Sequence, residues 1–221
     1  MRGLWLLLAA VVAVGLAVTK MYERATPRNE LQNDMKGIAQ AVEDGTRLPA
    51  MDSTIRSRDP DDIVMETLFR RFYNEKGMPL TNAFDESVLA LGDWDNLLNQ
   101  EMMREPEDFA RRRDMIRRSL QLYASHKQNY LALVDELKAE AETAQFRQAA
   151  KRSFFIGELE YGRDLFLEGI ELNTRSLALM DQMVMFLEAS RDRWFIDNGT
   201  LIFTEDDEMN RYNHLAGQNA E

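Results

Sequence analysis

The sequence predicts an all-α protein that carries one small β-hairpin near its carboxyl end. Apolar residues recur every three or four positions over most of the chain, which is the period of a helix packed on one face. Glycine and proline are few, 11 and 5 among 221 residues, and most stand at expected helix ends. The dipeptide Asn198-Gly199 lies between two short β-prone runs, a pattern typical of a tight hairpin turn. Together these observations predict an elongated helical bundle with a terminal hairpin.

An apolar segment at the amino end, Gly3 to Val18, predicts contact with a lipid bilayer. Crossing a membrane takes about 20 apolar residues, with roughly 17 as the lower limit. Thr19, Met21 and Tyr22 extend the run, so residues 3–22 are predicted to form a single transmembrane helix. A cleaved signal peptide is the alternative, because Arg2 forms a short basic region ahead of the apolar run. The predicted organisation is an anchor or signal peptide over 1–24 and one helical domain over 25–221.

The charge pattern excludes some partners but does not fix the topology. Arg2 competes with Lys20, Arg24 and Arg28, and this balance slightly opposes export of the domain. The net charge of −11 repels phosphate backbones, so we expect no nucleic-acid partner. The absence of cysteine is compatible with the cytoplasm and with a bacterial periplasm.

The first half of the chain predicts helices separated by a loop. A first helix is expected near Leu31–Val42, ending at Gly45, followed by a loop over 46–58. Asp59-Pro60 supplies an N-cap and a first-position proline for a second helix, which we expect to end at Gly77. Residues 78–105 are predicted to form two short helices divided near Gly92, the second of them carrying Trp94, Leu97, Leu98 and Met102.

Two long helices are predicted next, joined near Thr143 as an antiparallel hairpin. The first begins at Pro106, and Arg113 and Lys127 interrupt its apolar seam as polar residues. The second runs from about Ala144 to Arg193. The predicted seam residues are Phe109, Ile116, Leu120, Tyr123, Tyr130, Val134 and Leu137 in the first, and Phe155, Leu159, Phe166, Ile170, Leu177, Met180, Val184 and Leu187 in the second.

The carboxyl end is predicted to form a clasp on the bundle. Asn198 and Gly199 should occupy the two central positions of the hairpin turn. Phe195 and Phe203 are expected to bury against the long helices together with Tyr212. Thr204 is expected to cap a final helix that presents Met209, Tyr212 and Leu215 to the bundle.

Two segments carry a family resemblance: Gly45-Thr46-Arg47-Leu48-Pro49, and Phe195 to Phe203 with the later Tyr212-Asn213-His214-Leu215. In order and placement they resemble a family of bacterial envelope lipoproteins that contain a domain of unknown function. The chain lacks that family's lipid-modified cysteine, so its own apolar segment would have to attach it. The resemblance implies a single-pass protein of the bacterial inner membrane with its domain in the periplasm, and it implies no activity.

No set of residues in the sequence predicts catalysis, a cofactor or a metal. His126 and His214 lack the helical spacings of metal ligands. The arginines at 111–113, 117 and 118 are expected to form a neutralised helix surface rather than an anion site. Met180, Met183 and Met185 are expected to fill the core, with an adaptable binding groove as the alternative.

The sequence therefore predicts a non-enzymatic envelope protein that acts through protein–protein contacts. The alternative is a small-molecule-binding or sensory helical domain. The candidate interaction or structural residues are Arg47, Phe195, Asn198, Gly199, Phe203, Tyr212 and Asn213. For Arg47 and Asn213, bonds to local backbone groups are the structural alternative.

Overall fold

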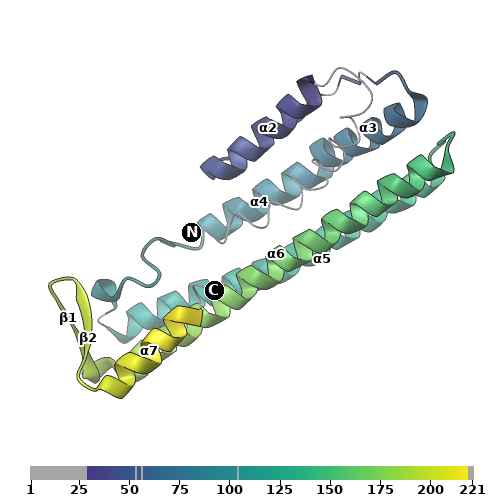
Figure 1. The fold of residues 1–221 in the computed structure, drawn as a ribbon. Coiled ribbons are helices and arrows are strands. Elements are labelled where there is room, and N and C mark those ends of the chain that lie inside the picture. The colour runs from purple at the N-terminus through teal and green to yellow at the C-terminus, as the bar shows by residue number, and fades with distance from the viewer. Residues whose placement is uncertain (1–28, 53, 56, 104, 219–221) are drawn as a thin grey trace. The chain divides into compact units, whose positions relative to one another are not determined.

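The computed structural model describes residues 29–218 except 53, 56 and 104. It is mostly helical with one small antiparallel hairpin, as predicted (Figure 1). No helix among the described residues has the length and apolar character to cross a membrane. The predicted anchor, residues 3–22, lies outside the described residues. The elements are α2 (Asn29–Asp44), α3 (Pro60–Phe72), α4 (Met78–Leu89), α5 (Pro106–Thr143), α6 (Ala149–Ala189), β1 (Trp194–Asp197), β2 (Thr200–Phe203) and α7 (Asp206–Gln218).

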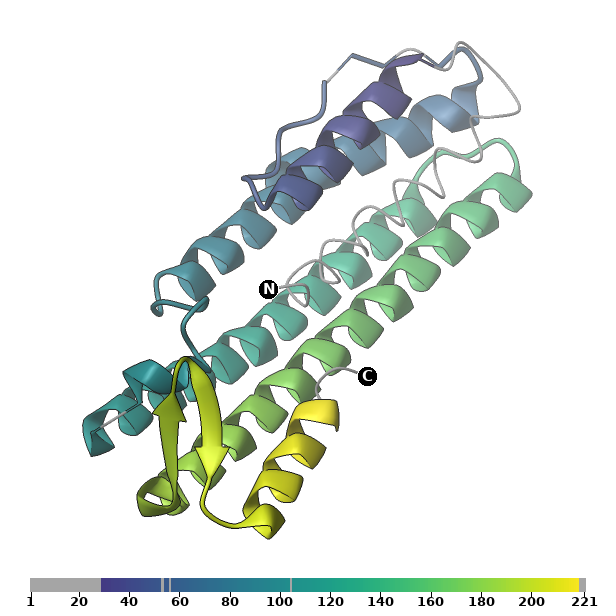
Figure 2. The same cartoon turned by 60° about the vertical axis from the view of Figure 1, so that its left-hand side comes forward.

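The described chain forms two compact units. The amino-terminal unit contains residues up to 86 together with 124–171, and the hairpin unit contains 87–123 together with 172–218. Helices α5 and α6 contribute to both units. Within the amino-terminal unit they are joined at residues 144–148 and run antiparallel, as Figures 1 and 2 show.

Helix α3 begins as predicted but does not end as predicted. The Asp59 side chain accepts hydrogen bonds from the backbone N–H groups of Asp61 and Asp62, at 2.9 and 3.3 Å. At its carboxyl end α3 passes through a π-helical turn, Tyr73–Gly77, directly into α4. Pro79 explains the turn, because a proline inside a helix lacks one N–H and its ring crowds the carbonyl four residues earlier. The widened turn accommodates Pro79, so the prediction that the helix ends at Gly77 is wrong.

Side chains from the continuous α3–α4 run fasten the loop after α2. Asn82 accepts a bond from the Leu48 backbone N–H at 2.8 Å and donates one to the Leu48 carbonyl at 3.3 Å. Asn74 makes the same pair of bonds with Met51, at 2.8 and 2.9 Å. Because Asn74 and Asn82 are eight residues apart, they lie about two turns apart on one face. The loop is therefore held along the helix by its backbone, while Leu48 and Met51 are buried.

The seam of α5 contains polar residues that the apolar pattern misplaced. The predicted seam residues other than Leu120 are buried, and Leu120 is half-buried. Arg113 and Lys127, expected as the polar interruptions, are instead exposed. The polar seam residues are Arg112, Ser119 and His126, each spaced seven residues from the next and at most 4% exposed. Arg112 and His126 each stand one residue before the predicted polar interruption, and Ser119 lies between two predicted seam residues. All three positions continue the alternating three- and four-residue steps of the seam.

The remaining differences concern element ends. Helix α6 spans Ala149–Ala189 rather than 144–193. The second short helix expected between Gly92 and Glu105 is replaced by turns and a short 3-10 turn, Gln100–Met102. Gly92 has a φ of +151°, and the buried Arg112 side chain donates to the carbonyls of Asn96 and Leu97. Those carbonyls are thereby satisfied without a helix.

Candidate interaction surface

The hairpin turn forms as its sequence predicts. Strands β1 and β2 pair antiparallel, with Trp194 opposite Phe203 and Asp197 opposite Thr200. Asn198 and Gly199 are the two loop residues, and their φ angles are +49° and +78°. Two positive φ angles are what a twist-matched two-residue hairpin needs, and asparagine and glycine adopt them most readily.

The inner face of the hairpin packs on the carboxyl end of α6, beside α7 (Figure 2). The Trp194 Nε1 group donates to the Leu187 carbonyl at 2.8 Å. The Phe203 ring lies 5.8 Å from the Phe186 ring and 5.6 Å from the Tyr212 ring, measured between centroids. The Tyr212 ring also lies 6.4 Å from the Phe186 ring. Phe203 and Tyr212 therefore contact the long helix, but both are half-buried rather than buried as predicted.

The base of the hairpin is fixed by polar contacts. Thr204 donates twice to the Arg193 carbonyl, from its backbone N–H at 2.8 Å and its hydroxyl at 3.2 Å. Its hydroxyl thus closes the hairpin and does not cap α7, contrary to the prediction. The buried Glu208 of α7 pairs with Arg193 at 2.9 Å. Arg193 therefore joins the start of β1 both to Thr204, which follows β2, and to α7.

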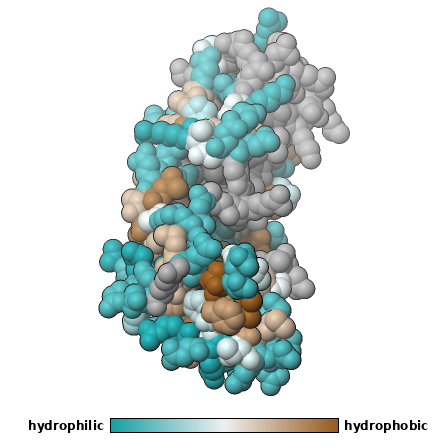
Figure 3. Space-filling view, turned by 90° about the vertical axis from the view of Figure 1, so that its left-hand side faces the viewer, coloured by the Kyte–Doolittle hydropathy of each residue, from teal (hydrophilic) through white to brown (hydrophobic). Residues whose placement is uncertain are grey.

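Phe195 is exposed at the surface, so the prediction that it is buried is wrong. Its side chain is 50% exposed. Neighbouring residues of a strand point to opposite faces, and Trp194 and Ile196 occupy the inward positions. Phe195 shares the outward face with Ile202, its cross-strand partner. Figure 3, which looks onto the hairpin end, shows apolar side chains gathered in its lower half among polar ones.

Arg47 and Asn213 belong to different units, and neither takes the local backbone role considered as an alternative. Arg47 is exposed and pairs with the exposed Glu86 at 3.7 Å. Asn213 is exposed on α7, and its side chain makes no hydrogen bond to any residue that the structure describes. The backbone role in the first family-like segment falls instead to Gly45, with φ +63°, and to Leu48, held by Asn82.

A groove lies between α6 and α7, whereas a groove at the methionine-rich stretch was only the alternative to core filling. It encloses about 520 Å³ and opens to solvent. Its lining residues are Gln182, Met185 and Phe186 of α6 and Asn210, Arg211, His214 and Leu215 of α7. Met183 is buried, as expected of a core filler, but Met185 is 45% exposed and lines the groove. The methionine-rich stretch was the sequence signal for this feature.

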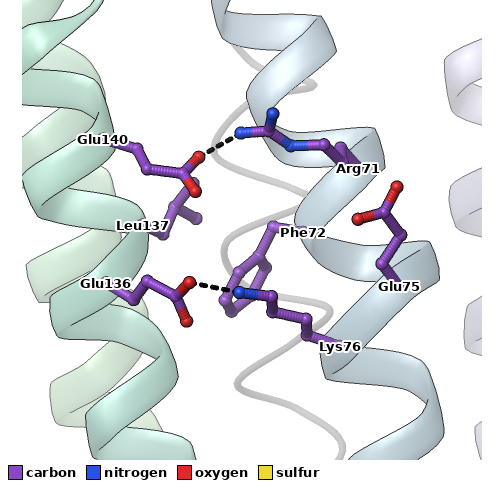
Figure 4. Close-up of a pocket in the computed structure, with 7 residues that line it drawn as sticks. All are labelled: Arg71, Phe72, Glu75, Lys76, Glu136, Leu137 and Glu140. Atoms are coloured by element: carbon purple, nitrogen blue, oxygen red, sulfur yellow. Dashed lines mark hydrogen bonds and ion pairs between the residues drawn. The ribbon is translucent and has the colours of Figure 1, made fainter.

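A second pocket, in the amino-terminal unit, is closed by ion pairs (Figure 4). Arg71 pairs with Glu140 and Lys76 with Glu136, from the α3–α4 run to α5. The Phe72 and Leu137 side chains lie between these pairs, and the remaining space is about 10 Å³. That volume is about what a single water requires, so the pocket has no room for a larger ligand. The two ion pairs join the helices here.

His126 lies in an aromatic cluster of the amino-terminal unit. Its ring stacks on Phe84 at 4.3 Å and meets Phe166 edge-on at 5.5 Å. Burial lowers the pKa of His126 to about 4, and its Nδ1 atom has no hydrogen-bond partner within the described chain. On α4, burial raises the pKa of Asp85 to about 6. Over the residues that the structure describes, no three His, Asp or Glu side chains group as metal ligands.

The arginine cluster of α5 is neutralised, as expected. Arg111 pairs with Asp108 at 2.9 Å, and Arg118 pairs with Asp114 at 2.7 Å. Arg113 reaches Asp181 and Glu188 of α6, at 3.5 and 3.4 Å.

Comparisons with known proteins add no relative, since no family model, curated protein or solved structure matches the chain.

Proposed function

We propose that the protein is a single-pass membrane protein without enzymatic activity that works through protein–protein contacts of its hairpin unit. Residues 3–22 form the transmembrane helix of this proposal, and the domain lies in the periplasm of a bacterium. The apolar run and the family-like segments support the anchor and the location.

The exposure of Phe195 is the observation that supports a contact surface on the hairpin. A hairpin whose inner face and base are fixed holds this aromatic ring at the surface with little conformational freedom to lose. Buried aromatic anchors contribute much of the free energy of protein–protein binding, and pre-organisation lowers the cost of forming the contact. The neighbouring Ile202 extends the apolar face.

Co-purification of the full chain from membranes of the native host tests this proposal. Phe195→Ser should lose the bound partner while its melting temperature changes little, because the ring is half exposed. Phe154→Ser is the matched control, since Phe154 is 41% exposed on α6 in the amino-terminal unit. Equal recovery of partner from both variants would contradict the assigned surface.

Protease treatment of spheroplasts tests the proposed location. Digestion of the domain without lysis is the expected result. Protection until lysis would place the domain in the cytoplasm and overturn this part of the proposal.

A further inference from the structure

The lining of the α6–α7 groove combines apolar and basic residues. Met185, Phe186 and Leu215 are its apolar lining residues, and Arg211 and His214 are its ionisable ones. None of the seven lining residues is acidic, although the chain holds 38 acidic against 27 basic residues. Arg211 forms no ion pair with any residue that the structure describes. The groove therefore fits an occupant that brings an acidic group beside apolar surface.

Helix α7 itself carries an acidic group on the same side. Asp207 precedes Arg211 by four residues and His214 by seven, so the three lie on one helical stripe. All three are exposed, and Asp207 also forms no ion pair within the described ranges. The stripe is acidic near the amino end of α7 and basic toward its carboxyl end.

Such a stripe is self-complementary about a two-fold axis. When two copies of one helix pack antiparallel, the acidic end of each meets the basic end of the other, as an isologous interface requires. We propose that a second copy of this chain occupies the groove, with Asp207 of each copy lying between Arg211 and His214 of the other. Asn210 then lies near the axis. The inference rests on the proposed function, in that the hairpin unit is the part that makes protein contacts.

The size of α7 sets the strength of this dimer. The helix has 13 residues, which is about 20 Å at 1.5 Å per residue. A standard stable interface buries roughly 800 Å² on each partner, more than one such helix supplies. The dimer is therefore weak in dilute solution and depends on confinement of both copies to one membrane, which raises their effective concentration. The full chain in a bilayer is the sample that tests it.

Cysteine crosslinking gives a direct test because the chain has no cysteine. Full-length Asn210→Cys is reconstituted in phosphatidylethanolamine–phosphatidylglycerol vesicles and oxidised with copper phenanthroline. A disulfide needs Cα atoms within about 7 Å, which the proposed axis provides at position 210. Asn213→Cys is the matched control, since Asn213 is exposed on α7 but does not line the groove. We expect several-fold more disulfide-linked dimer from position 210, and equal yields or no dimer would overturn the proposal.

A charge exchange separates specific pairing from chance collision. In the Asn210→Cys background, Asp207→Arg and Arg211→Glu should each reduce the dimer several-fold, and the double variant should restore it. Melting temperatures confirm that every variant is folded. Failure of the double variant to restore the dimer would overturn the inference, as would a small molecule recovered from the groove in its place. Either result leaves the Phe195 co-purification test unaffected, so the two proposals fail separately.

Discussion

Both units bury polar groups that hold segments together, but among the described residues the hairpin unit leaves more large apolar side chains at the surface. In the amino-terminal unit, Arg70 is buried between Asp34 and Glu66, and Asp61 accepts bonds from the backbone N–H groups of Arg147 and Gln148 where α6 begins. Of the nine large apolar side chains that are exposed among the described residues, six lie in the hairpin unit: Leu89, Met102, Leu172, Met185, Phe195 and Met209. The difference is the basis for the proposal that the hairpin unit makes the protein contacts.

The largest expected loss of stability comes from a substitution in the polar core of the amino-terminal unit. Arg70→Met removes the cation that pairs with Asp34 at 2.7 Å and Glu66 at 2.8 Å, and it leaves the Glu66 carboxylate buried. Losing one partner of a buried pair costs about 3–5 kcal/mol. Arg113→Met is the counterpart in the hairpin unit, where a pair with 43% exposure of the arginine should contribute under about 1 kcal/mol. Chemical denaturation of both variants measures the contrast, and equal losses would refute it.

A second prediction concerns the hairpin turn. Gly199→Val forces a β-branched residue to a φ of +78°, which should lower the free energy of unfolding by about 1–3 kcal/mol. Gly217→Val should cost less, because an added Cβ at Gly217 meets no atom within 4 Å and its φ is not positive. Thermal melts of the two variants compare them, and a larger loss at Gly217 would contradict the turn assignment.

A third prediction concerns pH and the amino-terminal unit. The pKa of His126 is lowered to about 4, so its contribution to stability is full above pH 6.5 and declines as pH falls toward 4. The pKa of Asp85 is raised to about 6, so this residue favours the folded state increasingly as pH falls from 6 toward 3.8. The two effects oppose each other between pH 6 and 4.

Single variants should expose these opposing slopes. Relative to the unmodified protein, His126→Leu should gain stability as pH falls through that window, and Asp85→Asn should lose it. Each change amounts to about 1 kcal/mol per pH unit. Urea titrations at pH 6 and pH 5 provide the measurement, and identical slopes for both variants would argue against these burial effects.

Local patterns predicted the helices and the turn but not the contacts between segments. Spacings of three and four residues located α5 and α6, and Asn198-Gly199 located the hairpin, because those signals are short-range. The seam positions of Arg112 and His126 were missed because an apolar count passes over polar residues that are buried with partners or against rings. The bonds from Asn74 and Asn82 to the loop could not be predicted, because they depend on which distant segments meet. The methionine-rich stretch pointed to a groove, but not to α7 as its other side. Phe195 points outward because Trp194, the preceding residue of the strand, points inward and bonds the Leu187 carbonyl.

Site-specific photocrosslinking in intact cells tests the division of roles most directly. A photoreactive phenylalanine analogue replaces Phe195 in one strain and Phe154 in another, with the full chain expressed in its native membrane. We expect protein adducts at position 195 and few at position 154. Adducts at position 154 with none at position 195 would contradict this division of roles.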